Sequence, residues 1–101
     1  MAAKYIAISS ATTTTLLTKD TSNTSTQYAG LIKSVRISNN HDTTAAVVDL
    51  FLDGTTDYWI IKGISIPAGV ALDVDNVSFN INTHDLKLTR TGSNDLTVRI
   101  E

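Results

Sequence analysis

Apolar and polar residues alternate one by one in short runs along much of this chain, and this period of two limits the fold more than any other feature. The run LTVRIE, residues 96–101, places Leu, Val and Ile on one phase and Thr, Arg and Glu on the other. Successive side chains of a β-strand point to opposite faces, so this alternation is typical of a strand with one buried face. No segment keeps the apolar spacing of an amphipathic helix over about 11 residues. We therefore expect an all-β protein.

The composition agrees with this expectation. Threonine, a β-branched residue that fits a half-exposed strand, occurs 16 times, whereas glutamate occurs once. Apolar residues make up 42% of the chain, which is enough to form a core. A length of 101 residues suits one domain. We expect a single domain over residues 1–101, in which residues 1–18 form an N-terminal strand or arm that is used in assembly.

Short alternating runs separated by turn residues predict eight or nine strands. This spacing is typical of a single antiparallel β-sandwich, of either the jelly-roll or the immunoglobulin-like type. Asn39 to Asp42 form a predicted turn, and residues 20–27 form a predicted loop. The predicted strands cover residues 4–9, 13–18, 31–38, 45–53, 58–66, 70–74 and 77–81, a run around Leu86 and Leu88, and residues 96–101.

The single proline of the chain marks a corner of this sandwich. Pro67 has no N–H to donate to a β-ladder, so it ends the strand that precedes it. Gly69 can supply the positive φ that such a corner requires, and alternation restarts at Val70. A second glycine, Gly63, lies where the alternation of residues 58–66 changes phase, which predicts a β-bulge or bend there.

Composition argues against several classes of function. The chain has no cysteine, so it has no disulfide framework and no thiolate ligand or nucleophile. Eight basic and ten acidic residues give a net charge of −2, and the basic residues form no cluster. Nucleic-acid-binding proteins normally carry a basic patch, so we expect no nucleic-acid partner. The chain has no apolar run near 18 residues, and we read no signal peptide and no membrane partner.

Histidine and aspartate are the remaining candidates for chemistry. Each histidine precedes an aspartate in a predicted turn, where both residue types are common for structural reasons. Alternating aspartates on two predicted strands resemble solvated faces more than the closely spaced loop ligands of a calcium site. We therefore predict no enzyme, no catalytic or metal-binding residue and no cofactor. The positions considered are His41 with Asp42, His84 with Asp85, Asp49 with Asp53, and Asp73 with Asp75.

An apolar surplus points to an interface instead. Phe51 falls on the outward phase of its predicted strand, beside Val47. The run Tyr58-Trp59-Ile60-Ile61 is apolar on both phases, so one of its faces must meet a second sheet or another chain. A sugar-binding platform of aromatic rings is a less favoured alternative. The interface candidates are Phe51, Val47, Tyr58, Trp59, Ile61 and Tyr5.

The segment WIIKGISIPAGVALDVDN, residues 59–76, resembles small virion structural proteins of tailed bacteriophages. The upstream segment VRISNNHDTTAAVVDLFLDG is similar to the same family, and the resemblance spans residues 28–101. It implies a β-sandwich that serves as a head decoration protein or as a tail or neck component, and it carries over no catalytic residue. The matching positions are Ile60, Ile61, Lys62, Ile66, Pro67, Ala68, Gly69 and Leu72.

The resemblance and the apolar surplus together lead to one expectation with two alternatives. We expect a capsid decoration, or cement, protein that binds the major capsid protein, stabilises the head and associates with itself as a homo-oligomer such as a trimer. It would be made in the host cytoplasm and reside in the virion, on the capsid surface or the tail. The alternatives are a tail, neck or baseplate accessory protein and, less favoured, a carbohydrate-binding module.

Overall fold

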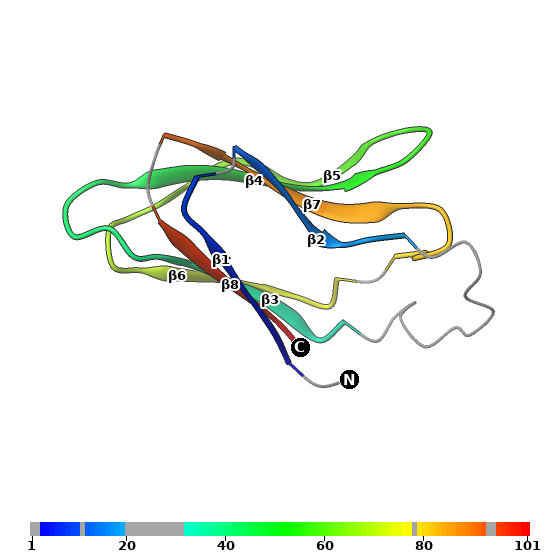
Figure 1. Cartoon of the computed structure of the whole chain (residues 1–101), viewed down its shortest axis with the longest axis horizontal. Helices are drawn as coiled ribbons and strands as arrows, with labels where there is room; N and C mark the ends of the chain where they lie inside the picture. Colours follow the sequence, from blue (N-terminus) through cyan, green and yellow to red (C-terminus); the bar gives the residue numbers. More distant parts are fainter. Residues whose placement is uncertain (1–2, 11, 20–31, 78, 93–94) are drawn as a thin grey trace.

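The chain folds into eight antiparallel strands, which Figure 1 shows as two stacked layers. The computed structural model describes residues 3–10, 12–19, 32–77, 79–92 and 95–101, so the predicted loop at residues 20–27 lies outside the described residues. Within these ranges, no helix has the length and apolar character needed to cross a bilayer. The strands are β1 (Lys4–Ile8), β2 (Thr13–Leu17), β3 (Ser34–Asn39), β4 (Ala46–Asp53), β5 (Tyr58–Ile66), β6 (Ala71–Asp75), β7 (Asp85–Thr91) and β8 (Leu96–Ile100).

The strand order is that of a jelly roll. One sheet has the order β1-β8-β3-β6 and the other β2-β7-β4-β5. Strand β1 thus pairs with β8, β2 with β7, β3 with β6 and β4 with β5, as in a long hairpin that has been rolled up. The prediction of a single antiparallel sandwich is confirmed, and of its two types the pairing selects the jelly roll. Residues 1–18 contribute the edge strands β1 and β2, and their use in assembly stays a prediction.

The core lies between the two sheets and is filled by the inward phase of each strand. Alternation placed these side chains well: Val48 and Leu50 of β4 and all three apolar residues of β8 are buried. Hydrogen-bonded neighbours within each sheet place Ile37 beside Val98 and Leu50 beside Leu88 on the core-facing side. Fully buried aliphatic side chains of this kind contribute about 1.5–3 kcal/mol each through burial. The largest are Leu16, Ile32, Ile37, Leu50, Ile66, Leu86, Leu88, Leu96, Ile100, Val35, Val48 and Val98.

The predicted strand at residues 77–81 is wrong, although its inward side chains are buried as expected. Val77, Phe79 and Ile81 belong to the core cluster, but no strand is assigned to the described residues of this segment. The chain here leaves β6 in one sheet and crosses to β7 in the other, so it has no neighbouring strand to pair with along its length. Asn80 turns the chain at the end of the crossing, because its carbonyl oxygen accepts hydrogen bonds from the amides of Thr83 and His84, both at 3.2 Å.

Two strand boundaries also differ from the prediction. The strand predicted at residues 31–38 begins at Ser34, so Lys33 precedes β3 and stays exposed. Val70 was expected to face inward at the start of a strand, but it lies before β6 and is 45% exposed. Val70 instead ends the turn that starts at Pro67, since its N–H donates to the Pro67 carbonyl at 3.1 Å.

The corner predicted at Pro67 is present and joins the two sheets. It connects β5 with β6, and Gly69 has the positive φ of 71° that the turn requires. The neighbouring residue Asn39 was expected in a turn, but it is the last residue of β3 and only 1% exposed. The Asn39 carbonyl accepts a bond from Gly69 N at 3.0 Å, and Asn39 N donates to the Val70 carbonyl at 3.0 Å. The corner is therefore held to the end of β3 through backbone groups.

The irregularity predicted at Gly63 is also found. The register between β4 and β5 shifts between Val48 and Leu50, because Val48 pairs with Ile64 whereas Leu50 pairs with Ile61. Two residues of β5 thus lie opposite Asp49, which is the arrangement of a β-bulge. Gly63 has φ 66°, and its N–H donates to the Asp49 carboxylate at 2.6 Å. A second register shift follows between Leu50 and Phe51, so β5 is irregular twice along its length.

Candidate interaction surface

The outer face of the β2-β7-β4-β5 sheet carries the main aromatic cluster. Phe51 of β4 and Trp59 of β5 are cross-strand partners, and their ring centroids lie 4.7 Å apart at an interplanar angle of 38°. Trp59 is 47% exposed, whereas Phe51 is 8% exposed. The ammonium group of Lys62 lies 4.8 Å from the centroid of the Trp59 ring, in a cation–π contact. Phe51 therefore supports Trp59 from the sheet, and Trp59 is the ring that a partner can reach.

The other interface candidates of this sheet differ in exposure. Val47 is exposed two positions before Asp49 on β4, and Tyr58 is exposed at the start of β5, where its ring packs 5.4 Å from that of His84. Ile61 is partly buried against the core and so is not an outward contact residue. Ile64, which was not among the predicted candidates, is also exposed on β5. Val47 and Trp59 lie on the outer face, whereas Tyr58 and Ile64 pair with the core-facing Leu52 and Val48 and are exposed at the edge of the sheet. We call the exposed set Val47, Tyr58, Trp59 and Ile64 the β5 surface.

The β5 surface lies along an open edge of its sheet, since β4 is the only neighbour of β5 among the described strands. Edge strands are usually protected against pairing with other chains by charges, bulges or short length. The edge strand β6 is short and carries Asp73 and Asp75, and β1 is short and directs Lys4 Nζ across to the Leu16 carbonyl at 2.8 Å. Strand β5 spans nine residues, and its protection consists of Lys62 and the two register shifts.

Charged groups flank the aromatic pair on the same outer face. Lys87 is the β7 partner of Phe51, and its ammonium group forms an ion pair with Asp53. The hydrogen bond from Lys87 lowers the pKa of the Asp53 carboxyl, and the same bond raises the pKa of Lys87. Asp85 accepts a hydrogen bond from the Lys19 backbone N–H at 2.6 Å. The apolar area near Trp59 therefore has a polar rim, as protein interfaces commonly do.

Tyr5 is separated from the rest of the candidates, because β1 belongs to the other sheet. It is 70% exposed and is the cross-strand partner of Arg99 on β8. Arg99 in turn lies opposite Arg36 of β3, which lies opposite Asp73 of β6, so these four residues form one row across the outer face. Tyr5 and Trp59 were both interface candidates, and the sheet topology places the two on opposite layers.

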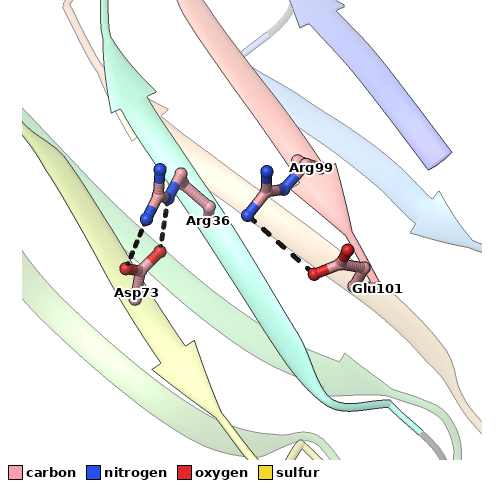
Figure 2. Close-up of polar contacts among 4 residues, drawn as sticks. All are labelled: Arg36, Asp73, Arg99 and Glu101. Atoms are coloured by element: carbon pink, nitrogen blue, oxygen red, sulfur yellow. Dashed lines mark hydrogen bonds and ion pairs between the residues drawn. The ribbon is translucent and has the colours of Figure 1, made fainter. Parts of the chain in front are cut away.

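Two arginines, Arg36 and Arg99, are neighbours in the middle of this row. Figure 2 shows that each points toward its own acidic partner, Arg36 toward Asp73 and Arg99 toward Glu101. The Arg36 guanidinium donates two hydrogen bonds to Asp73, at 2.7 and 2.9 Å. Arg99 points instead toward Glu101, with its Nη2 3.9 Å from Oε2, which is an ion pair beyond hydrogen-bond distance. The hydrogen bond from Arg36 lowers the pKa of the Asp73 carboxyl, and Coulomb attraction to Arg36 and Arg99 lowers it further.

We predict that replacing Arg36 with glutamine raises the pKa of Asp73 toward the ordinary value of an aspartate. The variant removes the guanidinium group that donates two charge-assisted hydrogen bonds to Asp73, and these bonds favour the ionised carboxylate. The lowered pKa means that this pair stabilises the fold at neutral pH and that its contribution is lost as pH falls through the pKa of the folded state. NMR titration of the Asp73 carboxyl carbon measures the change. Asp75, in the same strand but outside the ion pair, serves as the internal reference.

The histidine and aspartate positions do not converge on a metal site. Within the described ranges, no group of three or more His, Asp or Glu side chains is placed to hold a metal ion. His41 lies in the loop between β3 and β4, and His84 lies just before β7. Figure 1 shows this loop and the start of β7 at opposite ends of the sandwich. A shallow polar cavity of about 410 Å³ borders His41 and is lined by Asn40, His41, Asp42, Thr43 and Asp95.

Comparisons with protein-family models, with curated proteins and with solved structures found no match.

Proposed function

We propose that this protein is a non-enzymatic structural protein of a bacteriophage virion, most favoured as a capsid decoration protein that binds the major capsid protein through the β5 surface and stabilises the head. The observation that carries the proposal is Trp59, an exposed ring supported by a buried Phe51 on the longest edge strand of the sandwich. Exposed Trp and Tyr side chains are enriched among the residues that contribute most to protein interfaces.

The fold supports this proposal by analogy. Jelly rolls of eight strands are found in viral capsid proteins, and also in lectin domains. Because one fold serves many functions, this analogy adds to the argument from the β5 surface and does not replace it. The lectin analogy is weakened at Trp59 itself, where Phe51 and the Lys62 ammonium already contact the ring that would stack on a sugar.

The location within the virion is tested by mass spectrometry of purified particles with absolute quantification. A decoration protein occupies repeated sites on the head, so hundreds of copies per particle are expected. The alternative role in the tail, neck or baseplate requires ring symmetry, with about six or twelve copies. Absence of the chain from purified particles would contradict both roles.

We predict that Trp59→Ser weakens binding to expanded, undecorated heads of the same phage by about 30-fold, the effect of a hot-spot residue of about 2 kcal/mol. Co-sedimentation of purified protein with the heads over a range of concentrations measures the change. Val70→Ser is the matched control, since it removes an exposed apolar side chain at the corner before β6, outside the β5 surface and outside residues 1–18, and should change affinity less than about twofold. Equal binding of Trp59→Ser and the unchanged protein would reject the β5 surface as the contact face.

A further inference from the structure

We propose that protonation of His41 opens the loop between β3 and β4, so that this end of the sandwich responds to mild acid. The inference goes beyond the proposed function and rests on the hydrogen bonds of one imidazole ring. His41 Nδ1 accepts hydrogen bonds from the backbone N–H groups of Thr43, at 3.1 Å, and Thr44, at 3.0 Å. The ring thus closes the loop on itself.

This closed arrangement requires an unprotonated Nδ1. A neutral imidazole carries its proton on one nitrogen and accepts on the other, so acceptance at Nδ1 places the ring proton on Nε2. Protonation turns Nδ1 into a donor, which then faces the N–H donors of Thr43 and Thr44. Histidine is the side chain whose ordinary charge change falls between about pH 5 and 8, and in the protonated form of the ring this acceptor is lost.

The same surroundings offer the protonated ring an alternative position. The cavity beside His41 is lined by two carboxylates, Asp42 from the same loop and Asp95 from the residue before β8. These are the titratable groups that line this cavity with His41, and both attract an imidazolium. The neutral ring is therefore bound by the two amides and the charged ring by the carboxylates, which gives the loop two arrangements selected by pH.

The buried residue Asn39 confines the opening to the loop. Its side-chain amide donates to the carbonyls of Thr44, at 2.9 Å, and Ile66, at 3.0 Å, and its Oδ1 accepts from His41 N at 3.1 Å. None of these three bonds uses the imidazole ring. Both ends of the loop therefore stay attached to the sandwich when the ring turns away.

The second histidine provides a control within the same chain. His84 Nε2 lies 3.1 Å from the Thr56 carbonyl, which can only accept, so Nε2 donates. Its Nδ1 lies 2.7 Å from Thr83 Oγ1, and that hydroxyl also lies 3.2 Å from the Asn80 carbonyl. When His84 is protonated, Nδ1 can donate to Thr83 Oγ1 while the hydroxyl donates to Asn80. His84 therefore tolerates both protonation states without losing a bond.

NMR of the full chain tests the proposal, with the ring signals of both histidines and the water-exchange rates of the loop amides followed from about pH 7.5 to about pH 5. After correction for the intrinsic rate, exchange at the Thr43 and Thr44 amides should rise about tenfold along the titration of His41. The amides of Thr83 and His84, which donate to Asn80, should not follow the titration of His84. Unchanged protection at Thr43 and Thr44 while the His41 ring titrates would overturn the proposal.

Three variants separate the role of the ring from that of the carboxylates and of the rest of the loop. His41→Asn retains a side-chain oxygen that accepts from the amide two residues later but does not titrate, so the rise in exchange should disappear. His84→Asn is the matched control and should leave the response of Thr43 and Thr44 intact. The double change Asp42→Asn with Asp95→Asn removes the carboxylates that attract the charged ring, so opening should require a lower pH. A pH response that survives in His41→Asn would overturn the role of the ring, and an unchanged midpoint in the double variant would overturn the role of the carboxylates.

Discussion

Replacing Phe79 with alanine is expected to lower the free energy of unfolding by about 4 kcal/mol, although Phe79 belongs to no strand. Its side chain is part of the core cluster, together with its neighbours Val77 and Ile81. Truncation of a buried phenylalanine removes the transfer free energy of the ring and leaves a cavity that the surrounding side chains fill incompletely. The segment crosses from β6 in one sheet to β7 in the other, so the loss is expected to affect the contact between the sheets.

Val70→Ala is the control for this variant, because the alternation of the sequence predicts both side chains to face inward. Val70 is 45% exposed, and its bonds to Pro67 and Asn39 use backbone groups that alanine retains, so alanine should cost less than about 0.5 kcal/mol. Urea unfolding followed by Trp59 fluorescence measures both variants against the unchanged protein. A similar small loss in both would mean that the crossing segment contributes little to the core.

These two residues show what alternation can and cannot predict. A period of two reports which side chains face the core, and it placed Val77, Phe79 and Ile81 correctly. It does not report whether a second strand lies alongside, because pairing depends on chain segments that are remote in sequence. For the same reason alternation could not choose between the jelly-roll and immunoglobulin-like types, which differ in pairs as distant as β1 with β8.

Local backbone signals were more reliable than pairing. Pro67 and Gly69 predicted the corner because missing hydrogen-bond donors and positive φ angles act within a few residues. Gly63 predicted the irregularity of β5 for the same reason, since its N–H turns to Asp49 instead of continuing a regular ladder. Such signals place a turn or bulge in the sequence, but they do not say which strand the chain joins next.

The candidate surface was predicted in part. The outward phase of Phe51 was right, yet its low exposure depends on Trp59, and the register that pairs the two follows from the shifts in β5. Tyr5 was a candidate together with them although β1 joins the other sheet, because the sheet that a strand joins cannot be predicted from alternation alone. Ile64 was missed because it shares the core-facing phase of Ile66 and pairs with the buried Val48, so its exposure follows from the open edge of the sheet and not from its phase.

Replacing Asn39 with alanine is expected to lower the free energy of unfolding by about 3 kcal/mol. The variant leaves the Thr44 and Ile66 carbonyls without the donors that Asn39 Nδ2 supplies, and it removes the acceptor of the His41 N–H. A buried polar group that loses its partner costs about 1–3 kcal/mol, more than the net gain from making the bond. Because Ile66 ends β5 and Thr44 precedes β4, the loss is expected to loosen the junction of three strands at once.

Two further variants identify the cause of this loss, all measured by the same urea unfolding experiment. Asn40→Ala removes an exposed side chain whose bond, at 2.8 Å to Thr97 Oγ1, lies at the surface, so it should cost less than about 1 kcal/mol. Asn39→Asp retains the shape but places a carboxylate against the two carbonyl oxygens of Thr44 and Ile66, which disfavours the ionised form. The aspartate variant should therefore be less stable at about pH 7 than at about pH 4, relative to the unchanged protein at each pH. If Asn39→Asp were as stable as the unchanged protein at about pH 7 while Asn39→Ala still showed the full loss, volume, and not the two donated hydrogen bonds, would be what the junction requires at this position.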